Sequence, residues 1–192
     1  DIIESTDPST GKWLRGMVSK YQLLTKKEEI PLRTCQDVRL IYDDLVLPDL
    51  EVECPENIPD GTIFRKSTVF VRDARQNIIH TGLYPEEKII DAMSKALDFL
   101  NDTRINAFLR IAVFHYLFGY IHPFYDGNGR TGRFISSYLL SKELAPLIGF
   151  RLSVSIGKNR DLYYKSFKQA NDPKNRADLT LFVLAFLRIV LA

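Results

Sequence analysis

The stretch that most constrains this chain is segment 122–133, HPFYDGNGRTGR, which places a glycine-rich turn between two runs of helical character. The run before it, 105–121, is apolar on most faces and predicts a buried helix at the centre of the domain. Pro123 disfavours helical geometry at the preceding residue, so this helix should end near His122. The run after it, 131–145, has apolar residues at helical spacing and predicts a second helix.

The turn offers several groups that bind anions. A glycine-bearing loop that enters a helix leaves N–H groups unpaired at the positive end of the helix dipole. Gly127 and Gly129 permit backbone conformations closed to other residues, so successive N–H groups can converge on one anion. Asn128 tolerates left-handed geometry and adds an amide donor. Arg130 and Arg133 fall on the first turn of the helix, and both can point toward the same anion.

The same segment holds a base and a carboxylate. His122 stands where a rigid helix becomes a loop, which suits a catalytic base. Asp126 could hold Mg²⁺, because this ion takes one or two carboxylates together with substrate phosphates. Phe124 is expected to point inward and anchor the loop. A base, a metal-binding acid and a phosphate nest are together typical of phosphoryl or nucleotidyl transfer.

Each of these groups taken alone has an ordinary structural explanation. A histidine at a helix end is usually structural, a Gly-Asn-Gly turn is usually only a turn, and arginines near a helix start are usually solvated. Their conjunction in one short segment favours the functional interpretation. The other two histidines, His80 in a strand-like segment and His115 in the apolar run, are expected to be structural.

Segment 122–133 resembles the signature of the Fic-domain family: His-Pro-Phe, any residue, Asp or Glu, Gly-Asn-Gly-Arg, any two residues, Arg. Every fixed position is met. The resemblance implies a mainly α-helical fold, a Fic-fold helical bundle with a small β-hairpin flap beside the active-site loop. It also implies a protein adenylyltransferase, which uses Mg²⁺ and ATP to transfer AMP to a Ser, Thr or Tyr hydroxyl of a target protein. The related Doc toxins, which phosphorylate, carry Ala-Asn-Lys-Arg inside the loop, and this sequence does not.

The resemblance assigns a role to each position of the motif. It makes His122 the general base that deprotonates the target hydroxyl, Phe124 the anchor of the loop and Asp126 the ligand of Mg²⁺. The residues that it assigns to the phosphates of the nucleotide, as an anion hole and two clamps, are Gly127, Asn128, Gly129, Arg130 and Arg133.

The family has two further sequence features, an adenine-pocket pair and an inhibitory helix. The family has a Tyr and an Asn that line the adenine pocket, and Tyr164 and Asn171 have the same spacing. This match is less specific than the loop, and a packed tyrosine is the alternative. Many Fic proteins also carry an inhibitory helix. Its motif is Ser or Thr, then any three residues, then Glu, then Gly or Asn. No such string occurs in this sequence, since Glu56-Asn57 has Val52 where Ser or Thr is needed. We therefore expect no inhibition by these residues.

Length, net charge, cysteine content and hydropathy limit the class of protein and its partners. Its 192 residues suit one Fic domain, 1–192, and the absence of an initiator Met suggests a part of a longer protein. A net charge of +2 is too balanced to indicate nucleic acid or an acidic membrane as a partner. Cys35 and Cys54 lack metal-site spacing and indicate free thiols in a reducing, cytoplasmic setting. The apolar run 179–192 is too short for a membrane span and contains Arg188.

The chain should have three parts. Residues 1–60 should form N-terminal helices and a loop, residues 62–82 a β-hairpin, and residues 85–192 the helical core that carries the motif. The expected helices outside the motif, from apolar periodicity, cover 12–24 (with Trp13 as a packing anchor), 32–47, 85–101, 159–171 and 177–192. The proline-rich stretch 48–61 is expected to be a connecting loop.

The hairpin should have strands at 64–71 and 78–81, with little sheet to join and hence a free edge. Two interpretations stay open. The hairpin only covers the core, or its edge pairs with an extended segment of a target protein and lays a hydroxyl beside His122. Its position matches the flap of Fic proteins, which favours the second.

The expected function is therefore transfer of AMP from ATP to a protein hydroxyl, with release of pyrophosphate. The alternatives are a hydrolase that removes AMP on the same site, a transferase of another nucleotide or of phosphate, and a non-enzymatic nucleotide-binding module. Relatives use UTP, GTP or CDP-choline through the same loop, so the motif does not define the nucleotide. The target protein and the oligomeric state are not defined by the sequence.

Overall fold

The computed structural model describes residues 29–72 and 75–192, and this part of the chain is mainly helical. Its α-helices are α2 (Cys35–Leu45), α3 (Leu47–Glu53), α4 (Glu86–Asn101), α5 (Ala107–Ile121), α6 (Asn128–Glu143), α7 (Pro146–Lys158), α8 (Arg160–Ala170) and α9 (Thr180–Leu191). Two short 3-10 helices, η1 (Pro55–Asn57) and η2 (Pro173–Asn175), and two strands, β1 (Phe70–Arg72) and β2 (Ile78–Thr81), complete it. The predicted helix at 12–24, with Trp13, lies outside the described residues.

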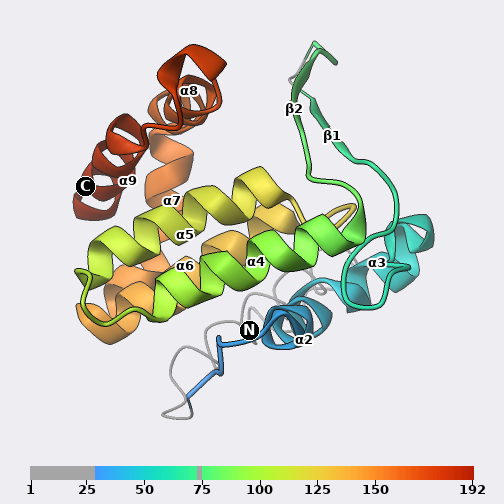
Figure 1. Cartoon of the computed structure of the whole chain (residues 1–192). Coiled ribbons are helices and arrows are strands. Elements are labelled where there is room, and N and C mark those ends of the chain that lie inside the picture. The colour runs from blue at the N-terminus through green and yellow to red at the C-terminus, as the bar shows by residue number, and fades with distance from the viewer. Residues whose placement is uncertain (1–28, 73–74) are drawn as a thin grey trace, which may run out of the picture.

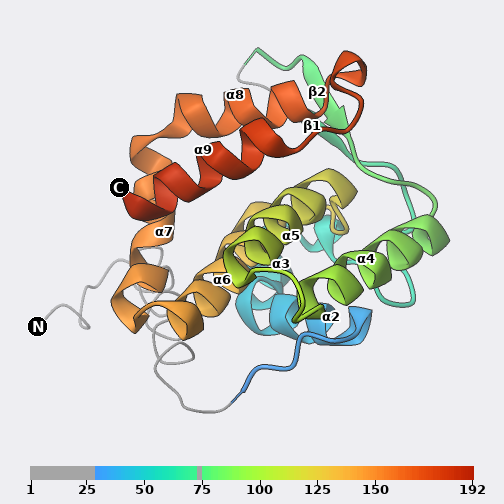
Figure 2. The same ribbon diagram turned by 60° about the vertical axis from the view of Figure 1, so that its left-hand side comes forward.

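Helix α5 lies at the centre of the fold, as its apolar sequence predicted. It packs against α4, α6 and α9, and Figure 1 shows these helices on different sides of it. Helices α2 and α3 cover the opposite side of the α4–α6 layer from α8 and α9 (Figures 1 and 2). A helix enclosed in this way needs apolar residues all round, and the buried residues of α5 include Ile111, Phe114, Phe118 and Ile121. None of the helices described is long and apolar enough to cross a membrane.

The two helices of the motif meet at a short turn. Helix α5 ends at Ile121, and its C-cap His122 has left-handed backbone angles, φ 52° and ψ 62°. Helix α6 begins at Asn128, three residues before the predicted start. Its N-cap is Gly127, with φ 78°, so this glycine uses the left-handed freedom that the sequence suggested. Gly129 does not, because it already lies within the first turn of α6.

The stretch 48–61 was predicted as a loop and is instead largely helical. It contains most of α3 and all of η1. Proline is tolerated in the first turn of a helix, where its missing N–H has no intrahelical acceptor to lose. Pro48 and Pro55 occupy such positions in α3 and η1. The prediction was wrong because it took each proline for a helix breaker.

The hairpin is real but its first strand is shorter than predicted. Strand β1 covers only Phe70–Arg72 and pairs antiparallel with β2, with Phe70 opposite Thr81 and Val71 opposite His80. Of the residues predicted to open that strand, Phe64 and Arg65 are buried instead, and the Arg65 N–H donates to Pro123 O. The Glu86 carboxylate accepts the backbone N–H groups of residues 62–64. Those three N–H groups therefore cannot donate to a neighbouring strand.

Candidate active site

A cavity of about 1040 Å³ lies between the hairpin, the C-terminal end of α5, the first turns of α6, and α8. Small-molecule sites in proteins have volumes of roughly 300–1,000 Å³, so this one is large enough for a nucleotide. The predicted site residues that line it are His122, Asn128, Gly129, Arg133, Tyr164 and Asn171. Of the other predicted residues, Asp126, Gly127 and Arg130 do not line it.

The His122 ring is held as a neutral base. Its Nδ1 lies 3.2 Å from the carbonyl oxygen of Gly119. A carbonyl oxygen can only accept, so Nδ1 carries the proton and Nε2 keeps its lone pair. Burial lowers the pKa of the His122 imidazole from the usual 6.5 to about 4. The charges of His80 and Arg65 also lower this pKa, whereas the Gly119 carbonyl and Asp126 raise it. The ring is therefore neutral at pH 7.

The loop after His122 is fixed by Phe124 and Asn128. The Phe124 ring is fully buried and stacks on Tyr42, with 3.6 Å between ring centroids, so Phe124 points inward as predicted. The Asn128 side chain brackets the Phe124 backbone: Nδ2 donates to the carbonyl oxygen at 2.7 Å, and Oδ1 accepts from the N–H at 3.0 Å. The Asn128 amide thus fixes the loop from within, with both its oxygen and its nitrogen engaged.

The first turn of α6 presents a cradle of backbone donors. The backbone N–H groups of Asn128, Gly129 and Arg130 come too early in the helix for an intrahelical acceptor, and no other described residue accepts them. The N–H of Gly127 donates to Asp126 Oδ1 instead. A Cβ on Gly127 would lie 2.5 Å from Val46 Cγ1, so only glycine fits this approach to α2 and α3. The free donors of the cradle therefore come from residues 128–130.

The two arginines of the motif point to different places, contrary to the expectation that both face one anion. Arg133 lines the cavity, and its Nη1 lies 2.9 Å from the position that a Cβ on Gly129 would take. No Asp or Glu of the described residues forms an ion pair with Arg133. Arg130 donates to Asp49 Oδ2 at 2.8 Å, and its Nη2 lies 3.6 Å from Asp126 Oδ2. The carboxylate of α3 draws Arg130 away from the cavity.

Asp126 has the chemistry of a single Mg²⁺ ligand. Its side chain is half exposed, and one of its oxygens already accepts the Gly127 N–H. The described residues contain no cluster of three or more His, Cys, Asp or Glu side chains. Mg²⁺ needs no such cluster when phosphate oxygens and water complete its shell, so a lone carboxylate beside the cradle fits a metal that is brought by a nucleotide.

The far wall of the cavity is formed by α8. Tyr164 is exposed at the wall, with the Arg160 guanidinium 6.0 Å from its ring centre. Asn171 accepts a hydrogen bond from the Tyr116 hydroxyl at 2.7 Å through Oδ1. Sequence reasoning missed the cationic character of this lining, which contains five basic side chains and no Asp or Glu within the described residues: Arg72, Arg133, Arg160, Lys165 and Lys168. Three of these residues, Arg160, Lys165 and Lys168, lie on α8, and their spacing in the sequence could have indicated this basic wall.

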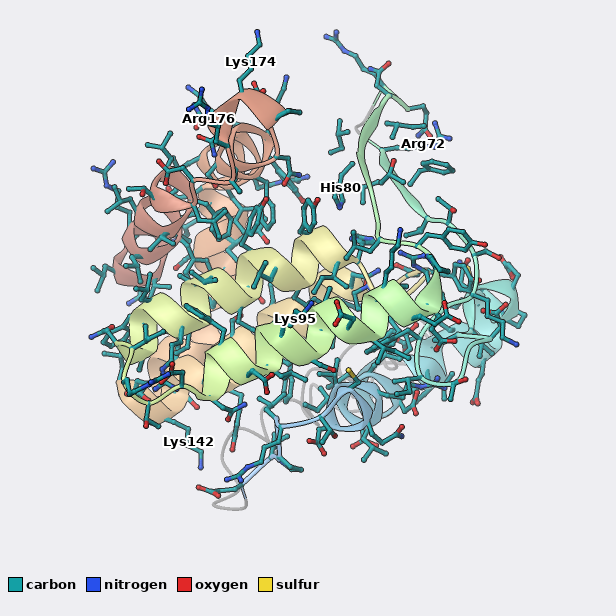
Figure 3. All side chains as sticks on the ribbon, in the orientation of Figure 1. Arg72, His80, Lys95, Lys142, Lys174 and Arg176 are labelled. Atoms are coloured by element: carbon teal, nitrogen blue, oxygen red, sulfur yellow. The ribbon has the colours of Figure 1, made fainter. Side chains whose placement is uncertain are left out.

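The other two histidines have structural contacts. His115 is buried and lies 2.7 Å from Ser136 Oγ and 2.8 Å from the Tyr163 hydroxyl, through its two ring nitrogens. Burial lowers the pKa of His115 to about 3, so it is neutral. His80 Nε2 lies 2.6 Å from the Tyr120 carbonyl oxygen, and Figure 3 shows His80 between the hairpin and the end of α5.

Comparisons with known proteins show the family to which this chain belongs. A sequence profile described as "Fic/DOC family" matches residues 34–140. A Fido domain-containing protein of Dictyostelium discoideum is 31% identical over 114 residues, which cover 59% of this chain and 73% of that protein. The protein adenylyltransferase Fic of Nematostella vectensis is 33% identical over 110 residues, 56% of this chain and 23% of that protein. A probable protein adenylyltransferase of Aquifex aeolicus is 29% identical over 127 residues, 60% of this chain and 32% of that protein.

Among solved structures, the fold resembles that of a Fic family protein from Desulfovibrio desulfuricans G20, with a TM-score of 0.74 and 24% identity. The match covers 97% of this chain and 52% of that one. This likeness concerns the fold alone. The chain spans less than a third of the length of the two adenylyltransferases. With the profile matching more than half of its residues and with the motif seated at the cavity, the chain belongs to the Fic/DOC family.

Proposed function

We propose that this chain transfers AMP from ATP to a Ser, Thr or Tyr hydroxyl of a target protein. The observation that carries the proposal is the meeting of three groups in one cavity. These are the neutral His122 imidazole, the N–H groups that begin α6, and the Arg133 guanidinium, and the last two have no partner among the described residues. The names of the relatives from Nematostella vectensis and Aquifex aeolicus support adenylyl transfer as the reaction.

The phosphates of the nucleotide would lie at the start of α6. The N–H groups of residues 128–130 and the helix dipole favour negative charge there. Arg133 adds a cation whose fork fits phosphate oxygens. Asp126 would hold Mg²⁺, which supplies further neutralisation of the phosphate charge when bound. The acid-free lining of the cavity supports a polyanionic substrate.

The chemical step follows from the position of His122. Its Nε2 takes the proton of the target hydroxyl, and the hydroxyl oxygen forms a bond to the α-phosphorus. The bond between the α-phosphorus and the bridging oxygen breaks, and pyrophosphate leaves. Base catalysis of this kind supplies roughly 10²–10⁴-fold in rate. Fixed donors at the developing negative charge supply a further share.

The adenine and the target segment would occupy opposite sides of the cavity. The adenine would lie near α8, where Tyr164 offers a ring face and Asn171 keeps its Nδ2 donor free, because only Oδ1 is used by Tyr116. The target segment would pair with the free edge of the hairpin, whose residues 77–80 also line the cavity. This arrangement would place a target hydroxyl near His122.

The absence of internal inhibition is part of the same proposal. Within residues 29–72 and 75–192, no glutamate forms an ion pair with Arg130 or Arg133. Glu56, the one glutamate followed by Asn, is exposed in η1.

The proposal also includes a reducing setting such as the cytoplasm. It is supported by Cys35 and Cys54, which are both free.

The decisive experiment incubates the protein with Mg²⁺ and ATP that carries ³²P at either the α- or the γ-phosphate, in the presence of candidate protein substrates. We expect label from the α-position only, and its loss in His122→Ala, while binding of a fluorescent ATP analogue persists. Label from the γ-position would indicate a Doc-like kinase. Label that survives in His122→Ala would contradict the assigned base. Binding without any transfer would indicate a nucleotide-binding module, and release of AMP from a pre-modified target would indicate the hydrolase.

A further inference from the structure

Arg65 is the largest fully buried side chain among the described residues. No Asp or Glu of this part of the chain forms an ion pair with it. Its three side-chain hydrogen bonds to described residues all go to backbone carbonyl oxygens. Nε donates to His122 O at 3.0 Å, Nη2 donates to Leu83 O at 2.7 Å, and Nη1 donates to Ser67 O.

A buried arginine without a carboxylate is costly. Arginine keeps its proton in proteins, and carbonyl dipoles only partly replace the water that it loses. Burial indeed lowers the pKa of the Arg65 guanidinium below its ordinary value. An apolar side chain of similar size would avoid this penalty. The position therefore calls for something that only the guanidinium fork supplies, namely several donors in one fixed plane.

The three acceptors belong to the two structures that must meet during catalysis. His122 carries the base, and its left-handed backbone is disfavoured for a residue with a side chain. Ser67 lies just before β1 and Leu83 just after β2, so these two carbonyls mark the two ends of the hairpin base. One guanidinium thus joins both ends of the hairpin to the residue that bears the imidazole.

Gly82 shows how closely these parts approach. A Cβ built on Gly82 would lie 2.4 Å from Arg65 Nη2 and 3.1 Å from His122 Cβ. Backbone bonds reinforce the junction, since Leu83 N–H donates to Ile121 O at 3.1 Å and Arg65 N–H donates to Pro123 O at 3.4 Å. The carboxylate of Glu86 fixes the backbone just before Arg65.

We propose that Arg65 is a positioning residue, which holds the His122 backbone in its left-handed conformation and sets the distance between the imidazole and a target segment on the hairpin. This proposal rests on the proposed adenylyl transfer. Arg65 does not itself line the cavity and touches no reacting atom, so it acts through the His122 backbone and through the hairpin. An error of about 1 Å in such placement can cost on the order of 100-fold in rate.

Arg65 also has an electrostatic effect that a purely structural residue would lack. Its charge lowers the pKa of the His122 imidazole, in addition to the effect of burial. The other charged groups that act on this ring are His80 on β2, which lowers its pKa, and Asp126 in the loop, which raises it. Removal of the Arg65 charge should therefore raise the pKa of His122.

The test compares Arg65→Met, which keeps the length without the charge, with Arg65→Lys, which keeps the charge without the fork. Arg104→Met is the matched control, because Arg104 is an exposed arginine whose one ion pair within the described part of the chain is with Asp102. The probes are ³²P-α-ATP with Mg²⁺ and a set of synthetic peptides that each contain one Ser, Thr or Tyr. The measurements are kcat, the KM for peptide, the Kd for a fluorescent ATP analogue, and the His122 titration by NMR.

We expect both Arg65 variants to lower kcat by roughly 10- to 100-fold, with the Kd for ATP changed less than about twofold and Arg104→Met unchanged. Only Arg65→Met should raise the pKa of His122. If Arg65→Met is too unstable to purify, Arg65→Lys supplies the test of kcat. Wild-type kcat in a folded Arg65 variant would overturn the proposal, as would a drop that comes only from weaker ATP binding. If the wild type transfers no AMP to any peptide, the proposed function fails, and the NMR titration still tests the link between Arg65 and His122.

Discussion

Asp49 of α3 and Arg130 of α6 form an ion pair beside the cradle of backbone donors that begins α6, with 2.8 Å between Oδ2 and Nη1. Both side chains are about a third or more exposed, at 43% and 32%. Exposed pairs of this kind contribute about 0–1 kcal/mol. A triphosphate carries far more charge than one carboxylate, so it can compete for Arg130. The pair is thus a weak restraint on an arginine that the family resemblance assigns to phosphate.

Replacing Asp49 with Asn should free Arg130 and tighten nucleotide binding. The expected gain in ATP affinity is about two- to fivefold, which corresponds to an exposed ion pair of up to about 1 kcal/mol. Isothermal titration with ATP and Mg²⁺ measures it. Asp44→Asn controls for the change in net charge, because Asp44 is an exposed acid of α2 that forms no ion pair with any described residue. Weaker binding in Asp49→Asn alone would mean that Asp49 orients Arg130 rather than competing for it.

The pH dependence of transfer should reflect a depressed pKa of the base. Burial lowers the pKa of His122 to about 4, with contributions from His80 and Arg65 and an opposing one from Asp126. The base is active when neutral, so the rate should stay level from pH 7 down to about pH 5 and fall as the pH approaches 4. The measurement is kcat/KM against pH. A midpoint near the ordinary histidine value of 6.5 would show that the ring is more hydrated than its burial indicates.

Stability should decrease in acid because His115 is buried without charge. Its folded pKa is about 3, well below the usual 6.5, so the unfolded chain binds the extra proton first as the pH falls. Below about pH 6.5 the free energy of unfolding should therefore fall by up to about 1.4 kcal/mol per pH unit for this residue. Urea unfolding between pH 7 and pH 5 measures the slope. His115→Gln should be less stable at pH 7 but should show a smaller slope, and an unchanged slope would assign the effect to other groups.

Two glycines provide a matched pair for the cradle. A Cβ at Gly127 would meet Val46 at 2.5 Å in a backbone with φ 78°, whereas a Cβ at Gly157 in α7 would meet nothing within 4 Å. Gly127→Ala should lower the free energy of unfolding by about 1–3 kcal/mol and weaken ATP binding. Gly157→Ala should leave binding unchanged and raise stability by up to about 1 kcal/mol. Equal effects of the two changes on ATP binding would contradict the proposed place of the phosphates.

The local parts of the site could be predicted from the sequence. Pro123 restricts the backbone angles of the residue before it, and apolar periodicity predicts a helix over a few turns. Phe124 is a large apolar side chain in a loop that is otherwise mainly polar. These effects operate between near neighbours. They predicted the end of α5, the inward position of Phe124 and the helix after the turn. The start of α6 was missed by three residues, since residues 128–130 were assigned to the loop rather than to the helix.

What the tertiary structure alone decided concerns residues far apart in sequence. Asp49 and Arg130 are 81 residues apart, and Arg65 and His122 are 57 apart. Their contacts determine which arginine faces the cavity and what holds the base. A contact at a distance also occupies the start of the predicted first strand, where Glu86 accepts the N–H of Phe64. The ion pair of Arg130 and the buried hydrogen bonds of Arg65 depend on distances that the packing of α3, α6 and the hairpin creates. A turn or a helix end depends instead on the backbone angles that its own residues allow.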